Sequence, residues 1–226
     1  MKKIITLLLL VSITLISLTS CKGGAEIEKG SGNPLEYGTG ACEYASSRNI
    51  EDREIYYVDI MFKNYGKVLV LLDKTTAPKT VEHFLKLVNA NFYDGLTIHR
   101  IQESFVIQGG DPNGDGLADE GLETVEGEFL NNYHYNNIKH KKGVISMARS
   151  TGYDSATSQF FICNADASSS LDGSYASFGY VIKGLDIIDE ITSDFAKYTS
   201  GDMGIIEDIK DQPIIEYIKV VEYIPE

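Results

Sequence analysis

The first segment of the chain with residues suited to chemistry is 92–111, FYDGLTIHRIQESFVIQGGD. It places Arg100 shortly before the apolar pair Phe105 and Val106, and Gln108 follows two residues later. A guanidinium stays protonated at physiological pH and offers several N–H donors, and a glutamine amide both donates and accepts. Donors of this kind beside apolar side chains suit an uncharged substrate with a polar atom next to an apolar group.

The second segment is 143–164, GVISMARSTGYDSATSQFFICN. It supplies another glutamine, Gln159, beside the aromatic pair Phe160 and Phe161. With the first segment it offers one cation, two amides and an aromatic floor. That set suits a neutral amide substrate that carries an apolar ring.

Together the two segments closely resemble the cyclophilin-type peptidyl-prolyl cis-trans isomerases. The similarity runs over residues 58–221, nearly everything beyond the N-terminal portion. The resemblance implies a mainly β fold, a closed eight-stranded antiparallel barrel capped by two helices. It also implies an isomerase that acts on proline-containing polypeptide segments and needs no cofactor and no metal.

The resemblance also assigns roles to individual residues. Arg100, inside IHRI, matches the family's catalytic arginine, and Gln108 matches the amide that holds it. The residues that match the substrate-binding surface are Phe105, Val106, Arg149, Gln159, Phe161, Leu171 and Tyr175.

Four positions depart from the family pattern. Val106 stands where methionine is common, and Arg149-Ser150 replaces an Asn-Ala pair, so peptide preference is expected to differ. Ser170 stands where many members carry tryptophan. Because that tryptophan lines the cyclosporin-binding surface, the resemblance implies weak inhibition by cyclosporin.

The hydrophobic pattern predicts the elements that must position these residues. Short apolar runs predict strands at 56–62, 67–73, 97–100, 105–108, 143–147, 159–163, 177–181 and 214–221. Asn64-Tyr65-Gly66 predicts a hairpin between the first two strands. Pro78 begins a predicted helix that ends near Asn91, and a second helix is predicted at 184–191.

Composition excludes some functions. The chain has 226 residues, of which 43% are hydrophobic, and a net charge of -13, which argues against nucleic acid as a partner. The three cysteines, Cys21, Cys42 and Cys163, and the four histidines have no spacing typical of a metal site. A Cys42–Cys163 disulfide stays open as an alternative to a buried free Cys163.

The N-terminus predicts export. Two lysines and a short apolar run are typical of a secretory signal peptide, here residues 1–20, and the run is short for a membrane-spanning helix. Leu18-Thr19-Ser20-Cys21 resembles a bacterial lipobox, which implies a lipid anchor on Cys21. Residues 21–54 are rich in Gly, Ser and Glu and are expected to form a tether to a domain at 55–226. Lys22 after the cysteine favours the outer membrane or another periplasm-facing membrane surface.

Two other functions stay open at this point. Asp111-Pro112-Asn113-Gly114-Asp115 fits the start of a calcium-binding loop, with Asp119 in register, but Leu122 stands where a bidentate glutamate is required. The second alternative is a non-catalytic module or chaperone that binds proline segments on the same barrel. We expect a monomer, and the loop 113–142 has no assigned role.

Overall fold

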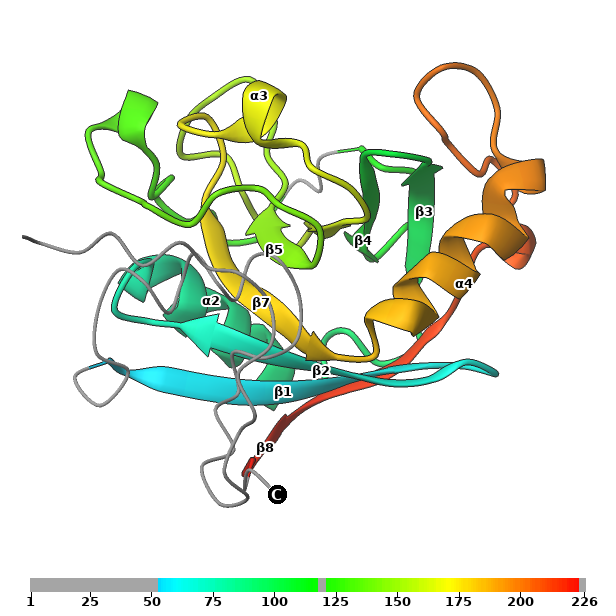
Figure 1. The fold of residues 1–226 in the computed structure, drawn as a ribbon, viewed down its shortest axis with the longest axis horizontal. Helices are drawn as coiled ribbons and strands as arrows, with labels where there is room; N and C mark the ends of the chain where they lie inside the picture. The colour runs from blue at the N-terminus through cyan, green and yellow to red at the C-terminus, as the bar shows by residue number, and fades with distance from the viewer. Residues whose placement is uncertain (1–52, 118–120, 224–226) are drawn as a thin grey trace, which may run out of the picture. The chain divides into compact units, whose positions relative to one another are not determined.

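The computed structural model of the protein describes residues 53–117 and 121–223 (Figure 1). The strands are β1 (Ile55–Phe62), β2 (Gly66–Asp73), β3 (Thr97–Gln102), β4 (Val106–Asp111), β5 (Val144–Met147), β6 (Phe160–Cys163), β7 (Ser177–Lys183) and β8 (Ile215–Val221). The α-helices are α2 (Pro78–Asn89), α3 (Ser168–Leu171) and α4 (Leu185–Phe195). The 3-10 turns are η3 (Leu130–Asn132), η4 (Ala196–Tyr198) and η5 (Ile209–Asp211). The predicted strands and both predicted helices are confirmed, whereas the one-turn helix α3 was not predicted.

All eight strands form one sheet, in the order β3-β4-β6-β5-β7-β2-β1-β8, and every paired neighbour is antiparallel. The predicted hairpin between β1 and β2 is present, with Phe62 opposite Gly66. Asn64 and Gly66 have φ values of 72° and 119°, which asparagine and glycine adopt more readily than other residues.

The prediction of a closed barrel is wrong, because the sheet is open between β3 and β8. These edge strands meet only at one end, where Thr97 bridges Ile214 and the Ile98 N–H donates to the Pro213 carbonyl at 2.9 Å. Farther along β3, residues 204–206 take the place that β8 would need. The Ile101 N–H donates to the Gly204 carbonyl at 2.7 Å, so the exposed edge of β3 is covered without closure of the barrel.

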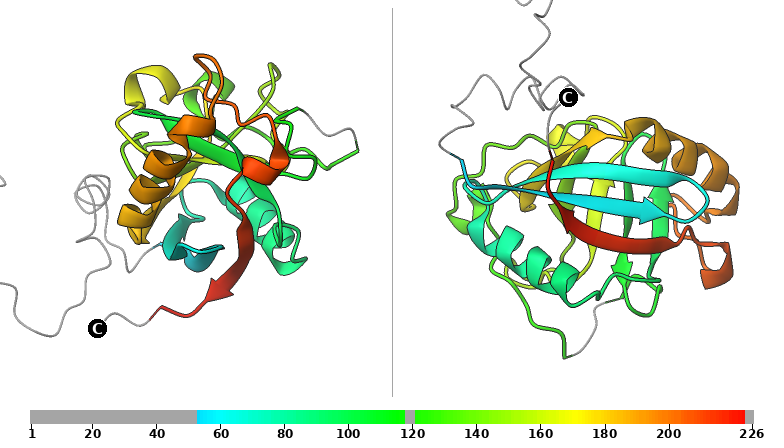
Figure 2. Two further views of the ribbon diagram at one scale, coloured as in Figure 1. Left: turned by 90° about the vertical axis from the view of Figure 1, so that its right-hand side faces the viewer. Right: turned by 90° about the horizontal axis from the view of Figure 1, so that it is seen from below.

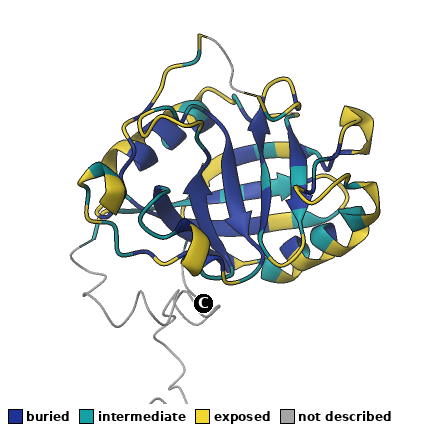
Figure 3. Cartoon of the chain, turned by 90° about the horizontal axis from the view of Figure 1, so that it is seen from above, coloured by how far each residue is buried: buried dark blue, intermediate teal, exposed yellow. Residues whose placement is uncertain are grey.

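The two faces of the curved sheet have separate cores. The inner face holds residues such as Ile60, Phe160 and Phe178, all at most 1% exposed. Helices α2 and α4 lie at opposite ends of the sheet (Figure 2) and add Phe84 and Ile188 to this core. Most residues of β2 to β7 are buried, whereas β1 and β8 include many partly or fully exposed residues and the loops above the sheet are mostly exposed (Figure 3). A second core on the outer face is where the site residues lie.

Gly179 of β7 must be a glycine because β2 and β5 approach it closely. A Cβ atom at Gly179 would lie 2.2 Å from the Leu71 carbonyl oxygen on β2 and 3.1 Å from Ile145 on β5. Both contacts are shorter than normal, and the backbone oxygen cannot move without breaking the pairing of β2 and β7.

We therefore expect Gly179→Ala to lower the free energy of unfolding by about 3 kcal/mol or more, at the upper end of overpacking effects. Urea denaturation followed by circular dichroism would measure the change. Gly152→Ala is the matched control, because Gly152 is exposed and its nearest neighbour to an added Cβ lies at 3.5 Å. Equal stability of the two variants would contradict the prediction.

The predicted signal peptide, the predicted lipid attachment at Cys21 and all but the last two residues of the predicted tether lie outside the described residues. Cys42 lies outside them as well. Cys163 is buried and not in a disulfide, and burial raises the pKa of its thiol to about 12. In the described ranges, no helix has both the length and the apolar character needed to cross a membrane.

Candidate active site

Strand register brings the residues of the two sequence segments into one row. Arg100 on β3 stands opposite Gln108 on β4, and Gln108 stands opposite Phe161 on β6. Phe161 in turn stands opposite Ser146 on β5. Directly opposed residues of neighbouring antiparallel strands lie on the same face of a sheet. The cation, the amide and the aromatic ring therefore share the outer face.

Three oxygen atoms hold the Arg100 guanidinium. Its Nε donates to the Met203 carbonyl at 2.8 Å, Nη1 to the Gln108 Oε1 at 3.3 Å and Nη2 to the Gln102 Oε1 at 2.6 Å. The Phe105 ring lies 5.6 Å from the guanidinium carbon. A guanidinium has five N–H groups, so two remain able to donate to a substrate.

Partial burial lowers the pKa of Arg100, because displaced water no longer stabilises its charge. The guanidinium remains cationic, as arginine does in proteins. In such a partly dehydrated site, a hydrogen bond from the cation to a substrate is stronger than it would be in water.

A chain of amides fixes the orientation of Gln108. The Gln108 Nε2 donates to the Gln159 Oε1 at 3.0 Å, and the Gln159 Nε2 donates to the Leu117 carbonyl at 2.8 Å. Because the Gln108 NH₂ group is engaged in this way, its oxygen faces Arg100. The two predicted glutamines thus act in series, and Gln159 supports Gln108.

A pocket of about 300 Å³ opens beside Arg100. Its lining residues are Arg100, Phe105, Val106, Gln108, Ala148, Arg149, Phe161, Leu171, Tyr175 and Met203. Every predicted site residue in the described part of the chain lines this pocket except Gln159. Gln159 lines an adjoining cavity of about 240 Å³ that shares Gln108, Ala148 and Arg149 with the first.

Arg149 does not direct its guanidinium into the pocket as a free cation. The group lies 4.8 Å from the Tyr175 ring, 5.2 Å from the Phe129 ring and 5.3 Å from the Tyr153 ring. Its Nε also donates to the Ser174 carbonyl at 2.9 Å. These contacts hold Tyr175 in place at the pocket wall, where its ring meets Phe161 edge-on at 5.7 Å.

A buried polar group supports Phe161 from behind. The His140 ring stacks on Phe161 at 5.9 Å, with Nδ1 2.9 Å from an Asp172 carboxylate oxygen and Nε2 3.0 Å from the Ser146 hydroxyl. The order Ser-His-Asp is that of a hydrolase triad, but Ser146 is 0% exposed. A substrate cannot reach the Ser146 hydroxyl, so we interpret the three residues as a brace for the pocket floor.

Sequence reasoning missed Ala148 and Met203, which line the pocket beside Arg100, and Gln102, which holds the Arg100 guanidinium. Gln102 had a signal, since it is two residues from Arg100 on one strand and so lies on the same face. For Ala148 the sequence signal was weaker, namely that this residue directly follows β5. For Met203 the sequence contained no signal. Met203 is more than 100 residues from Arg100 in a polar stretch, and only folding brings the two together.

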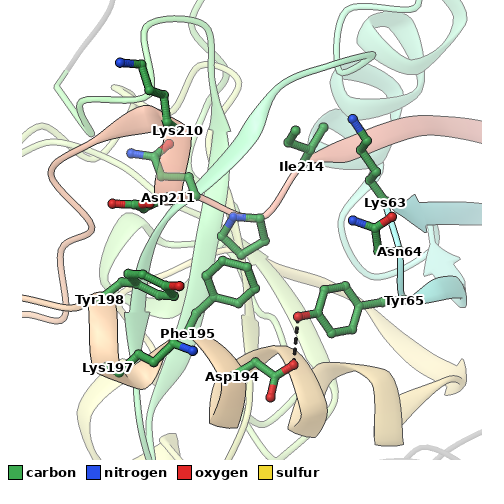
Figure 4. Close-up of a pocket in the computed structure, with 12 residues that line it drawn as sticks. Lys63, Asn64, Tyr65, Asp194, Phe195, Lys197, Tyr198, Lys210, Asp211 and Ile214 are labelled. Atoms are coloured by element: carbon green, nitrogen blue, oxygen red, sulfur yellow. Dashed lines mark hydrogen bonds between the residues drawn. The ribbon is translucent and has the colours of Figure 1, made fainter.

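A second cavity, of about 460 Å³, is larger than the pocket beside Arg100 and shares no residue with it. It lies between the β1–β2 turn, the end of α4 and the residues before β8 (Figure 4). Its side chains include Lys63, Lys197 and Lys210, but their amino groups point in different directions and do not converge on one ligand (Figure 4). We therefore assign the chemistry to the smaller pocket.

The calcium loop considered from the sequence has a different arrangement in its described part. The Asp111 carboxylate accepts hydrogen bonds from the backbone N–H groups of Asn113 at 3.1 Å and Gly116 at 2.6 Å. Asp119 lies outside the described residues. Among those residues, no three His, Cys, Asp or Glu side chains gather in a way that could hold a metal ion.

The fold is a single antiparallel sheet, and its outer face carries a pocket lined by a cation, an amide and apolar side chains. The model of the family "Cyclophilin type peptidyl-prolyl cis-trans isomerase/CLD" matches residues 57–220. The chain belongs to this family.

The relatives include a peptidyl-prolyl cis-trans isomerase of Acinetobacter baylyi, 35% identical over 68% of this chain and 79% of the relative. Peptidyl-prolyl cis-trans isomerase B of Escherichia coli is 32% identical over 70% of this chain and 96% of the relative. A crystal structure of a cyclophilin type isomerase from Cryptosporidium parvum superposes with a TM-score of 0.62 at 27% identity, over 75% of this chain and 99% of that one.

Proposed function

We propose that this cyclophilin-type isomerase accelerates rotation about X-Pro bonds in exported or envelope polypeptides, assisting their folding, with Arg100 as the catalytic donor. The observation that carries the residue assignment is the position of Arg100, with two uncommitted N–H groups at the edge of an apolar pocket. The related Cryptosporidium protein was crystallised in the presence of the dipeptide Ala-Pro. The use of a proline-containing dipeptide with that relative supports a proline-containing substrate for this chain.

The chemistry requires no nucleophile. Rotation about a peptide bond has a barrier of about 18–20 kcal/mol, which arises from resonance along the C–N bond. The cis and trans X-Pro forms differ by only about 0.5–1 kcal/mol, yet they exchange in tens to hundreds of seconds. A catalyst therefore needs to stabilise only the twisted amide, in which the nitrogen lone pair is localised.

The role proposed for each side chain follows from its position in the pocket. Phe105, Phe161 and Leu171 hold the proline ring by apolar contact, while Arg100 donates a hydrogen bond to the amide nitrogen as the bond twists. Because the planar ground-state amide has no localised lone pair on nitrogen, this hydrogen bond forms mainly in the transition state. Such an interaction raises kcat without tighter binding of the ground state.

A non-catalytic binding module on the same fold is the second candidate. The apolar pocket alone would serve either function, whereas the engaged and oriented guanidinium favours catalysis. A coupled prolyl-isomerase assay on a short X-Pro peptide separates the two. Binding of the peptide without turnover by the unmutated protein would favour the module.

We further propose that the isomerase domain is held at an envelope membrane surface by acyl chains on Cys21. The proposal is supported by the apolar run before Leu18-Thr19-Ser20-Cys21 and by the Gly-, Ser- and Glu-rich residues between Cys21 and β1. A tether of about 30 residues would let the pocket reach polypeptides that emerge near the membrane. The domain acts as a monomer in this proposal.

Cys21→Ser is expected to abolish acylation and to leave an unprocessed or released protein. Metabolic labelling with a fatty acid, together with mass spectrometry of the mature N-terminus, would measure this in the bacterial host. Cys42→Ser is the matched control and should keep its label. A mature protein that begins elsewhere and carries no acyl mass would contradict the anchor.

A further inference from the structure

Residues 203–206, here called the edge segment, run beside β3 at the rim of the pocket. Next to Arg100, the edge segment lies at the position that β8 would occupy in a closed barrel. We infer that it is a positioning element of the isomerase: the Met203 carbonyl orients Arg100, and the Met203 side chain forms one wall of the substrate pocket. The inference rests on the function proposed above.

The edge segment is fixed to β3 by backbone hydrogen bonds. The Ile206 N–H donates to the His99 carbonyl at 2.9 Å, and the Ile101 N–H donates to the Gly204 carbonyl at 2.7 Å. Ile205 thereby stands opposite Arg100 in an antiparallel bridge. The Met203 carbonyl is thus held by the same strand that carries the arginine.

Gly204 makes this close approach possible. Its φ is +70°, a value that residues with a side chain rarely adopt. A Cβ atom there would lie 2.2 Å from the Ile101 carbonyl oxygen and 2.9 Å from the Gln102 Cα. Any residue but glycine must therefore move the edge segment away from β3, and the Met203 carbonyl would move with it.

The Met203 carbonyl completes a three-sided support of the guanidinium. Gln108 and Gln102 hold the two terminal nitrogens, and the carbonyl holds Nε at 2.8 Å. With the carbonyl bond the plane of the group is fixed before a substrate binds. An arginine without that bond would have to give up side-chain freedom during the reaction, which lowers kcat.

The Met203 side chain has a separate role. It is 58% exposed, yet it lines the pocket together with Phe105 and Leu171. An exposed, flexible thioether at the rim of a polypeptide-binding pocket can pack against apolar side chains of different shapes. In this inference the Met203 side chain contacts the substrate residue next to the proline. It therefore affects KM and peptide preference.

The two roles predict effects on different kinetic constants. Met203→Ala keeps the carbonyl and removes the wall, so KM should rise about three- to tenfold for a peptide with an apolar residue beside proline, with kcat nearly unchanged. Met203→Leu should restore most of the KM. Gly204→Ala should lower kcat about tenfold or more, the loss expected for a hydrogen bond to a charged group.

Gly201→Ala controls for backbone strain. Gly201 has φ +61° but nothing within 4 Å of an added Cβ, and it lies outside the edge segment. It should keep kcat close to that of the unmutated protein. If Gly204→Ala and Gly201→Ala have the same kcat, the positioning role is overturned.

A spectroscopic readout tests the carbonyl directly on the unmutated full chain. The Arg100 Nε–H proton should exchange slowly with water and give a resolved signal in ¹⁵N NMR, and Gly204→Ala should lose this protection while Met203→Ala keeps it. Rapid exchange in the unmutated protein would refute the inference even if Gly204→Ala fails to fold. A protected Nε–H in a protein that binds peptide without turnover would refute the proposed catalysis and leave the carbonyl contact intact.

Discussion

Arg100→Ala should lower kcat/KM for a short X-Pro peptide roughly 30- to 1000-fold, which corresponds to a loss of about 2–4 kcal/mol of transition-state stabilisation. The variant removes the cation at the pocket edge, and with it the donor for the twisted amide nitrogen. Peptide binding should weaken much less, because the apolar residues that hold the proline ring remain. A coupled isomerase assay and a peptide titration on the same preparation would measure both quantities.

Arg100→Lys is the informative companion variant. An ammonium keeps the charge but lacks the planar fork that Gln102, Gln108 and the Met203 carbonyl hold in place. We expect it to lose most of the activity as well. Circular dichroism must show that both variants are folded, and full turnover by a folded Arg100→Ala protein would refute the assigned mechanism.

Phe161→Ala should abolish measurable peptide binding and also destabilise the protein. Phe161 is 3% exposed, forms the pocket floor and contacts both His140 and Tyr175. Truncation of a buried phenylalanine lowers the free energy of unfolding by about 3–5 kcal/mol. Urea denaturation and peptide titration at a temperature where the variant is folded would separate the two effects.

Phe160→Ala is the matched control for that experiment. Phe160 is the preceding residue on β6, is 1% exposed and belongs to the inner core, away from the pocket. Its truncation should cost similar stability and leave peptide binding intact. Equal loss of peptide binding in the two variants would mean that Phe161 acts through general packing rather than through contact with the proline ring.

The residue types of the outer-face site could be read from two segments because side-chain chemistry is a local property, whereas the role of each residue came from the family resemblance. Arginine, glutamine and paired phenylalanines in two short segments indicated the substrate type before any contact was known. Leu171 and Tyr175 came from the resemblance alone. The structure brings these residues together in one pocket, while their individual roles remain predictions for the assays above.

The closed barrel was the error in the predicted fold. The sheet stays open because of contacts between segments that are far apart in the sequence. Apolar alternation predicts which residues form strands, but it carries no information about which strand covers the edge of β3. Residues 204–206 occupy most of that edge, so the residues directly before β8 meet β3 only at Thr97 and Ile98. The difference depends on backbone hydrogen bonds across more than 100 residues.

By itself, the sequence determined the elements and the residue types of the site, because periodicity and side-chain chemistry are local properties, and the family followed from the resemblance of two segments. Only the tertiary structure decided how those residues act together. It turned the Arg149 guanidinium onto Tyr175, placed His140 behind Phe161 and brought the Met203 carbonyl to Arg100. Each of these contacts joins segments distant in the chain, and their distances follow from strand register and packing rather than from any local pattern.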